Sequence, residues 1–110
     1  MKTRIMYIED KSNGLTGIAR IGKVTFSKTM KSIHYKGKTY QSLKGSGLKA
    51  NFFETESGDG FWISGCKKDG SDRNYGERVP IYIDDDIQEE YWTVIRNLPD
   101  MVGTTILYGK

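Results

Sequence analysis

The sequence predicts a mainly β protein, a small antiparallel barrel or strongly curved sheet of about five to seven strands capped by one C-terminal helix. Three observations support this fold class. Short runs of β-branched and aromatic residues recur along the first 83 residues, glycine-containing turns separate them, and one helical pattern of apolar residues follows. The 110 residues are expected to form one domain, 1–110, with residues 1–3 and 100–110 loosely ordered.

The first two predicted strands are residues 5–8 and 18–27. In the second strand the apolar residues change face. Ala19 and Ile21 alternate on one side, whereas Val24 and Phe26 alternate on the other. A one-residue slip at Gly22 would produce this pattern, so we expect a β-bulge or a sharp bend there.

Two hairpins are predicted next. Residues 33–35 and 39–43 flank a short turn in which Gly37 can take the positive φ that a tight hairpin requires. Residues 50–54 and 61–64 flank a second turn that contains two glycines. Each pair is expected to form two adjacent antiparallel strands.

The C-terminal part predicts two strands and the helix. Residues 79–83 should form a strand that begins at Pro80 or lies on a sheet edge, because proline lacks an amide donor. A helix is expected at about 86–97, ended by Pro99, with a short strand at 104–108. Its expected cap is Asp84-Asp85-Asp86, with Glu89 three residues after Asp86, and its expected apolar stripe is Ile87, Tyr91, Val94, Ile95 and Leu98.

Charge is divided unevenly along the chain. Residues 1–49 carry eleven Lys or Arg and two acidic residues, a net charge of +9, whereas residues 50–110 carry six and twelve, a net charge of −6. Such asymmetry indicates an anionic partner for the basic half, or two halves that attract each other.

The basic half suggests binding of single-stranded nucleic acid. From residue 20 to residue 53, lysines alternate with aromatic residues on predicted strands, and small barrels bind single strands with cations on phosphates and rings on bases. The alternative is a solvated sheet whose aromatic residues lie in the core. The candidate nucleic-acid-binding residues are Lys23, Lys28, Lys36, Lys38, Tyr40, Lys44, Lys49, Lys67, Lys68, Arg73 and Arg78.

The last four of these residues lie in segment 65–78, the longest stretch without periodicity. Long loops in compact domains are often functional, and a glycine-rich loop with two arginines could hold a phosphate or a carboxylate. The acidic residues of the same loop could equally neutralise those cations.

Other chemistry-bearing residues favour structural roles. His34 is the only histidine, which excludes metal sites that need two imidazoles, and it is expected on the surface. Cys66 is the only cysteine, so no intramolecular disulfide forms, and a partly buried thiol is favoured over a reactive nucleophile. The aspartate triplet could bind a divalent cation, but helix capping explains it better. No catalytic residue, metal site or cofactor is predicted.

Location follows from the same composition. The apolar runs are only a few residues long, whereas a membrane-spanning helix needs about 20. The N-terminus has no apolar stretch of the secretory type. With its single cysteine, the sequence predicts a cytoplasmic protein without a membrane partner.

Several phrases resemble a group of small, uncharacterised bacterial proteins. These are residues 19–28, 40–45, 62–68 and 90–92, and the resemblance covers roughly residues 6–99. It implies a bacterial cytoplasmic origin and transfers no function. Some members of the group carry a label that connects them with 1-deoxyxylulose-5-phosphate synthase, a thiamine diphosphate enzyme. The tripeptide Gly58-Asp59-Gly60 gives that label no support, because it lies in a predicted hairpin turn without the helix and downstream asparagine of the enzyme's motif.

The leading functional expectation is therefore a binding module for RNA or single-stranded DNA. The runner-up is a non-catalytic protein-interaction module that uses a strand edge or the C-terminal helix, including its Trp92 side. A small hydrolase built on segment 65–78 is the third hypothesis. The functional argument requires that cations from successive strands converge on one continuous surface, with aromatic rings exposed among them.

Overall fold

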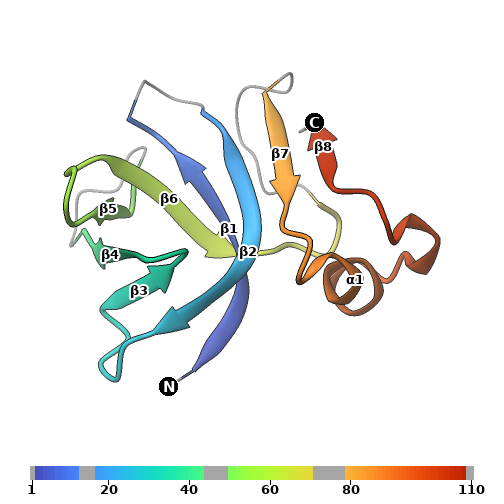
Figure 1. Cartoon of the computed structure of the whole chain (residues 1–110), viewed down its shortest axis with the longest axis horizontal. Coiled ribbons are helices and arrows are strands. Elements are labelled where there is room, and N and C mark those ends of the chain that lie inside the picture. Colours follow the sequence, from blue (N-terminus) through green and yellow to red (C-terminus); the bar gives the residue numbers. More distant parts are fainter. Residues whose placement is uncertain (1, 13–16, 44–49, 71–78, 109–110) are drawn as a thin grey trace.

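The computed structural model describes residues 2–12, 17–43, 50–70 and 79–108. Six strands form a closed antiparallel barrel, and two further strands and a short helical segment pack against one side of it (Figure 1). The order around the barrel is β1-β6-β5-β4-β3-β2, and pairing of β1 with β2 closes it, which confirms the predicted fold class. The strands are β1 (Thr3–Asp10), β2 (Ala19–Phe26), β3 (Ser32–Tyr35), β4 (Lys38–Ser42), β5 (Phe52–Glu54), β6 (Gly60–Gly65), β7 (Pro80–Ile83) and β8 (Ile106–Tyr108).

Both predicted hairpins are confirmed. β3 and β4 meet in a two-residue turn at Lys36 and Gly37, with φ angles of 48° and 80°. Positive φ at both central residues is the turn geometry whose twist matches that of paired strands. β5 and β6 form the second hairpin, in which Phe52 pairs with Phe61. Local turn chemistry therefore sets the register of both hairpins.

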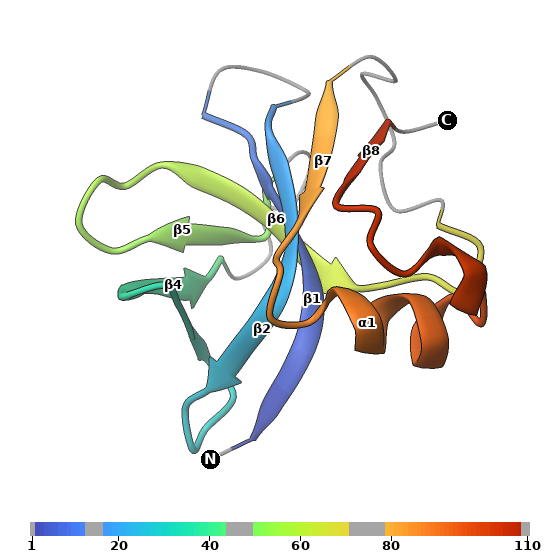
Figure 2. The same cartoon turned by 45° about the vertical axis from the view of Figure 1, so that its right-hand side comes forward.

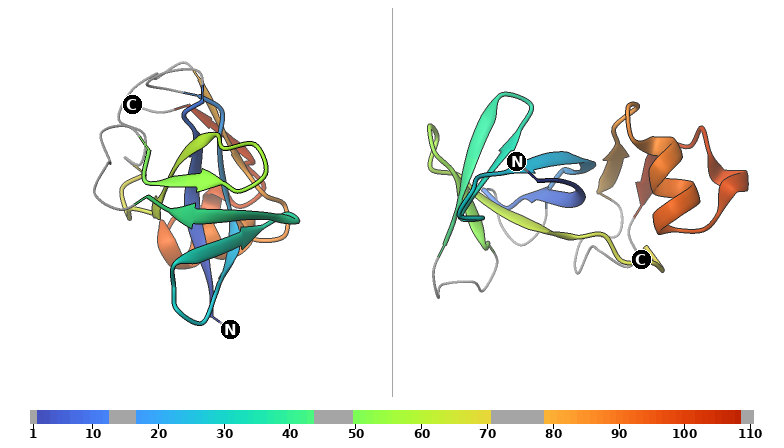
Figure 3. Two further views of the ribbon diagram at one scale, coloured as in Figure 1. Left: turned by 90° about the vertical axis from the view of Figure 1, so that its left-hand side faces the viewer. Right: turned by 90° about the horizontal axis from the view of Figure 1, so that it is seen from below.

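Two apolar cores lie on opposite faces of the β1–β2 ribbon. Figure 3 shows the barrel on one side of this ribbon and the helical segment with β7 and β8 on the other. The barrel core contains Met6, Ile8, Val24, Phe26, Ile33, Tyr35, Tyr40 and Ile63. The outer core contains Ile5, Tyr7, Ala19, Ile21, Ile81, Ile83, Ile87, Tyr91 and Trp92. The ribbon thus separates the two cores: β1 is buried on both faces from Ile5 to Glu9, whereas β2 also exposes Arg20 and Lys23.

This arrangement corrects one of the two alternatives expected at Gly22, the β-bulge. The ladder between β1 and β2 runs without a break from Thr3 to Glu9, so no extra residue is inserted opposite Gly22. The apolar residues change face along β2 because its first half contributes to the outer core and its second half to the barrel core. The contribution of β2 to two cores, rather than a register slip, explains the change of face.

The helical segment begins differently from the prediction. It comprises α1 (Gln88–Glu90), the π-helical turn η1 (Tyr91–Ile95) and the 3₁₀ turn η2 (Pro99–Met101). The N-cap residue is Ile87, and no side chain caps the helix, so the expected aspartate cap is wrong. The Asp84 carboxylate is occupied elsewhere, and Asp85 and Asp86 point to solvent.

The buried face of the helix also differs. The amide of Arg96 bonds to the carbonyl of Tyr91, five residues earlier, and this wider turn rotates the side chains that follow. Trp92 is consequently 1% exposed, whereas Val94 of the predicted stripe is 72% exposed. The indole of Trp92 packs in the outer core and donates a hydrogen bond to the carbonyl of Thr104, just before β8. Figure 2 shows the helical segment on the same side of the β1–β2 ribbon as β7 and β8.

β7 and β8 complete the outer layer. β7 begins at Pro80 as expected, pairs in parallel with β2 and pairs antiparallel with β8. β8 confirms the short strand expected within residues 104–108. Among the described residues, no helix combines the length and the apolar character needed to cross a bilayer.

Candidate functional site

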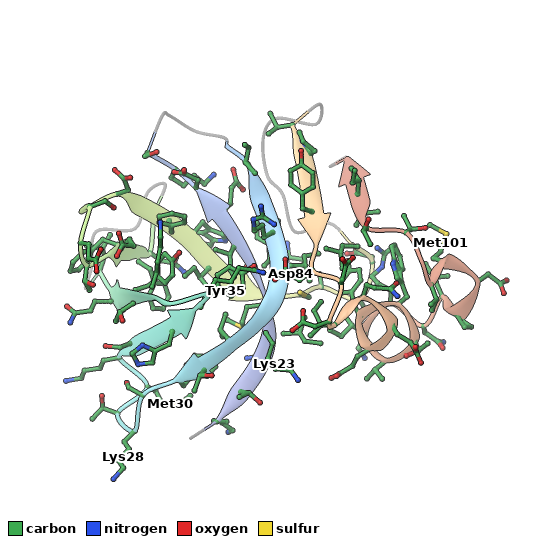
Figure 4. All side chains as sticks on the ribbon, viewed as in Figure 1. Lys23, Lys28, Met30, Tyr35, Asp84 and Met101 are labelled. Carbon is green, nitrogen blue, oxygen red and sulfur yellow. The ribbon has the colours of Figure 1, made fainter. Side chains whose placement is uncertain are left out.

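Two strands pair with the same edge of β2, at different positions along it. β7 pairs with residues 19–21 of β2, and β3 pairs with residues 25–26. The end of β3 and the end of β7 therefore lie on either side of the middle of β2. Tyr35, at the end of β3, and Asp84, directly after β7, point toward each other there (Figure 4).

Tyr35 and Asp84 form a buried hydrogen bond over Gly22. The phenol donates to Oδ2 of Asp84 at 2.6 Å, and the two residues are 6% and 8% exposed. A Cβ at position 22 would lie 2.4 Å from that carboxylate oxygen and 2.6 Å from Cε1 of Tyr35, so only glycine leaves room for both side chains. Burial and the hydrogen bond to Asp84 raise the pKa of the Tyr35 phenol far above its ordinary value. The phenol therefore stays protonated and keeps donating.

Two cations share the same carboxylate. Nη1 of Arg20 lies 3.6 Å from Oδ1 of Asp84, and Nζ of Lys36 lies 3.6 Å from Oδ2. Their side chains are 49% and 58% exposed, so both retain donors that face solvent. The Arg20 guanidinium also lies 5.5 Å from the centre of the Tyr82 ring. One buried carboxylate thus positions two partly exposed cations.

Two adjoining pockets open at these cations. We call the first the barrel-mouth pocket and the second the β7–β8 pocket, and Arg20 and Lys36 line both. The barrel-mouth pocket has a volume of about 320 Å³ and combines Ile8, Ile18, Tyr35, Tyr40 and Phe61 with Arg20, Lys36, Lys38 and Asp10. The β7–β8 pocket has a volume of about 470 Å³ and is lined mainly by polar residues, from Arg20 and Lys36, from the end of β7 with the three aspartates that follow it, and from the start of β8. Their volumes lie within the range of small-molecule sites, about 300–1,000 Å³.

The structure brings three predicted site residues together. Lys36, Lys38 and Tyr40 all line the barrel-mouth pocket. Tyr40, however, is 4% exposed, and its ring packs edge-on against Phe61 at 4.9 Å between ring centres. Phe26 is buried as well. Most rings of the predicted basic, aromatic face therefore pack inward. A ligand in the pocket would contact an apolar wall rather than exposed ring faces.

The other described candidates lie apart from this pocket. Lys23 is exposed on the face of β2 opposite to Arg20, because residues three apart on a strand point to opposite sides. Lys28 lies in the β2–β3 turn, at the far tip of the barrel from Tyr35 (Figure 4). Lys67 and Lys68 follow β6, and the carbonyl of Lys68 accepts a hydrogen bond from Arg96 of the helical segment. The predicted residues Lys44, Lys49, Arg73 and Arg78 lie outside the described residues.

The remaining chemistry-bearing residues have structural positions. His34 is exposed on β3, where its Nδ1 lies 3.1 Å from the Thr39 hydroxyl, which confirms a surface residue. Cys66 is half-buried, with Sγ 3.9 Å from the carbonyl of Ile5, as expected. Within the part of the chain that the structure describes, no three His, Cys, Asp or Glu side chains are grouped as a metal site would require.

Three residues of the site were missed by the sequence reasoning as binding residues. They are Arg20, Tyr82 and Asp84, and they converge because β2 and β7 pair in parallel across about 60 residues of chain. A signal for this was present in the sequence. A glycine inside a strand often marks a close approach of another group, and Gly22 marks the approach of Asp84 and Tyr35.

Comparisons with protein-family models, with curated proteins and with solved structures give no match for this chain. The resemblance to small bacterial proteins therefore stays a prediction. The function must be inferred from the geometry of the two pockets alone.

Proposed function

We propose that this protein binds single-stranded nucleic acid at the barrel-mouth pocket. In this proposal Arg20, Lys36 and Lys38 hold a backbone phosphate, and the attached base enters the apolar pocket behind them. One observation carries the proposal. Three cations from β2 and the β3–β4 hairpin line a single pocket whose other lining residues are mostly apolar.

The charges of the site favour an anion. Arg20, Lys36 and Lys38 carry three positive charges against the two carboxylates of Asp84 and Asp10, so the cations exceed the carboxylates by one unit. Arg20 can bind a phosphate through two parallel hydrogen bonds, and lysine adds a compact charge. Neutralisation of phosphates releases counterions, which makes such binding strongly salt-dependent.

The apolar wall favours a base rather than a bare phosphate. Ile8, Ile18 and Phe61 line the pocket beside the cations. Proteins recognise single strands by taking unstacked bases into apolar or aromatic surroundings next to a basic groove, and a base contributes about 1–3 kcal/mol there. The paired strands of a duplex would keep their bases stacked and out of the pocket. The proposal therefore specifies single strands.

The test is a comparison of two charge-reversal variants with equal net charge. Lys36→Glu/Lys38→Glu changes the pocket, and Lys28→Glu/Lys31→Glu is the matched control in the β2–β3 turn, where both lysines are exposed. Binding of a fluorescent RNA and a DNA of about twelve nucleotides is measured by anisotropy at several salt concentrations. We expect the pocket variant to weaken binding at least ~tenfold and to lower the salt slope by about 0.7, the value for one phosphate of a single strand.

The control variant should change the affinity much less. Equal losses in the two variants would show that only overall charge matters, and would reject the pocket. Absence of binding by the unaltered protein to both oligonucleotides would reject the function itself.

A specific observation supports a second candidate function, docking of an apolar protein partner. Large exposed apolar residues gather in the C-terminal segment: Val94, Leu98, Met101, Val102 and Ile106 are each at least 37% exposed. Met101 points away from the barrel (Figure 4). Trp92, which the sequence reasoning placed on the docking side, is buried and is not part of this surface. A partner retained after nuclease treatment but lost in Val94→Asp would favour this function.

We further propose a cytoplasmic location. Cys66 is the only cysteine and is not in a disulfide, which fits a reducing compartment. Cell fractionation tests this, and recovery of the protein outside the cytoplasm would contradict it.

A further inference from the structure

The β7–β8 pocket adjoins the barrel-mouth pocket and has different chemistry. Arg20 and Lys36 form the boundary between the two pockets. Beyond them Tyr82, Asp85 and Asp86 line the β7–β8 pocket. A strand whose phosphate lies at the boundary would place one base in each pocket. The second pocket is thus in position to take the neighbouring nucleotide.

A flat surface for a base exists in this pocket. The Arg20 guanidinium lies 5.5 Å from the centre of the Tyr82 ring, and the ring is partly exposed. Arginine planes and tyrosine rings are the two kinds of side chain on which unstacked bases commonly lie. Tyr82 therefore supplies a partly exposed ring beside the cations, whereas most of the rings predicted from the sequence pack inward.

The carboxylates decide which base fits. Asp85 and Asp86 are exposed, and ionised carboxylates accept hydrogen bonds but donate none. Cytosine, adenine and guanine each carry an exocyclic amino group that donates, whereas uracil and thymine donate only from N3–H, which lies between two carbonyl oxygens that a carboxylate repels. The same repulsion keeps the phosphate at the Arg20–Lys36 boundary.

We propose that the β7–β8 pocket is a second base site, which selects a base with an exocyclic amino group over uracil or thymine. The inference rests on the proposed function and extends it from one nucleotide to two consecutive ones. Tyr82 stacks with the second base, and Asp85 and Asp86 accept from its amino group. The two pockets then have separate roles: the barrel mouth provides affinity, and the β7–β8 pocket provides base preference.

The test compares oligocytidylate with oligouridylate of about twelve nucleotides, because the two pyrimidines have nearly the same size. Anisotropy titrations use the unaltered protein, Asp85→Asn/Asp86→Asn, and Asp59→Asn/Asp100→Asn as a control that changes the same charge at exposed positions elsewhere. The unaltered protein and the control should prefer oligocytidylate by about tenfold. The pocket variant should lose most of that preference, chiefly through tighter binding of oligouridylate.

The outcomes separate this inference from the proposed function. Binding that depends on Lys36 and Lys38 but shows no cytosine preference, or a preference that survives Asp85→Asn/Asp86→Asn, overturns the second site and leaves the first. Failure of every oligonucleotide to bind overturns both. Tyr82→Leu gives a further check, since it should weaken both oligonucleotides several-fold, and unchanged binding would contradict stacking on Tyr82.

Discussion

Asp84→Asn is the sharpest single perturbation of the site, because Asp84 contacts Tyr35, Arg20 and Lys36. The substitution keeps the shape of the side chain and removes its charge. Tyr35 retains an acceptor at 2.6 Å, but the two cations at 3.6 Å lose their partner. We expect Asp84→Asn to destabilise the fold and, at the same time, to strengthen binding of an anion.

The expected loss of stability follows from three contacts. A hydrogen bond to a charged acceptor stabilises by about 1.5–3 kcal/mol and one to a neutral acceptor by about 0.5–1.5 kcal/mol, so the bond from Tyr35 loses about 1 kcal/mol. Each exposed ion pair contributes about 0.2–1 kcal/mol, and Arg20 and Lys36 are about half exposed. The total is about 2 kcal/mol, or a fall in Tm of about 10 °C for a domain of this size.

The assay is urea unfolding followed by tryptophan fluorescence, since Trp92 is 1% exposed and reports on the outer core. Repeating Asp84→Asn in a Tyr35→Phe background completes a double-mutant cycle, which should give a coupling of about 1 kcal/mol. A loss below about 0.5 kcal/mol, with no coupling, would refute the view that the buried carboxylate organises the site.

The same variant should bind oligonucleotides more tightly. Without the carboxylate, Arg20 and Lys36 direct their full charge at the ligand, and we expect a gain of roughly threefold to tenfold in affinity at low salt. Anisotropy titration of Asp84→Asn measures this gain. Weaker binding by a variant that is still folded would mean that Asp84 positions the cations more than it competes for them.

Three further predictions concern stability. Gly22→Ala should cost about 1–3 kcal/mol in urea unfolding, because the new methyl group overlaps Tyr35 and Asp84; unchanged stability would show that the two side chains can move apart freely. The pKa of Tyr35 is raised in the folded state above its unfolded value of about 10. The contribution of Tyr35 to the free energy of unfolding is therefore complete below pH ~10 and declines above that pH by up to about 1.4 kcal/mol per pH unit. Tyr35→Phe should remove that part of the alkaline decline in unfolding midpoints, and parallel curves would contradict the raised pKa. Glu9→Gln should lower the free energy of unfolding by about 3 kcal/mol in thermal unfolding, because it removes the carboxylate charge 3.1 Å from the buried Lys11 ammonium. A loss under about 1 kcal/mol would mean that other groups neutralise Lys11.

The elements that the sequence predicted correctly are those set by local chemistry. Gly37 permits the positive φ of a two-residue turn, and Pro80 marks the start of β7. Both effects act within a few residues, so they are visible without the fold. The expected Gly22 bulge was wrong because alternation alone cannot distinguish a register slip from a strand buried on both faces.

The features that the sequence reasoning missed depend on contacts between distant segments. The helical stripe assumed 3.6 residues per turn, but the π-helical turn at Tyr91 buried Trp92 and exposed Val94. Asp84 was assigned to a helix cap, whereas its partner Tyr35 lies 49 residues earlier in the chain. The basic half drew attention to Lys36 and Lys38, but only the parallel pairing of β2 with β7 brings Asp84 to Arg20 and Lys36.

The wall shared by the two cores has a consequence for how the molecule opens. Amide protons of β1 and β2 lie in a continuous ladder between the two cores, so exchange with deuterated solvent should require global unfolding. β8 and the β3–β4 hairpin each border one core only and should exchange through local fluctuations. The amide protons of β1 and β2 would then exchange last, and those of β8 and the β3–β4 hairpin, on either side of the ribbon, would exchange earlier.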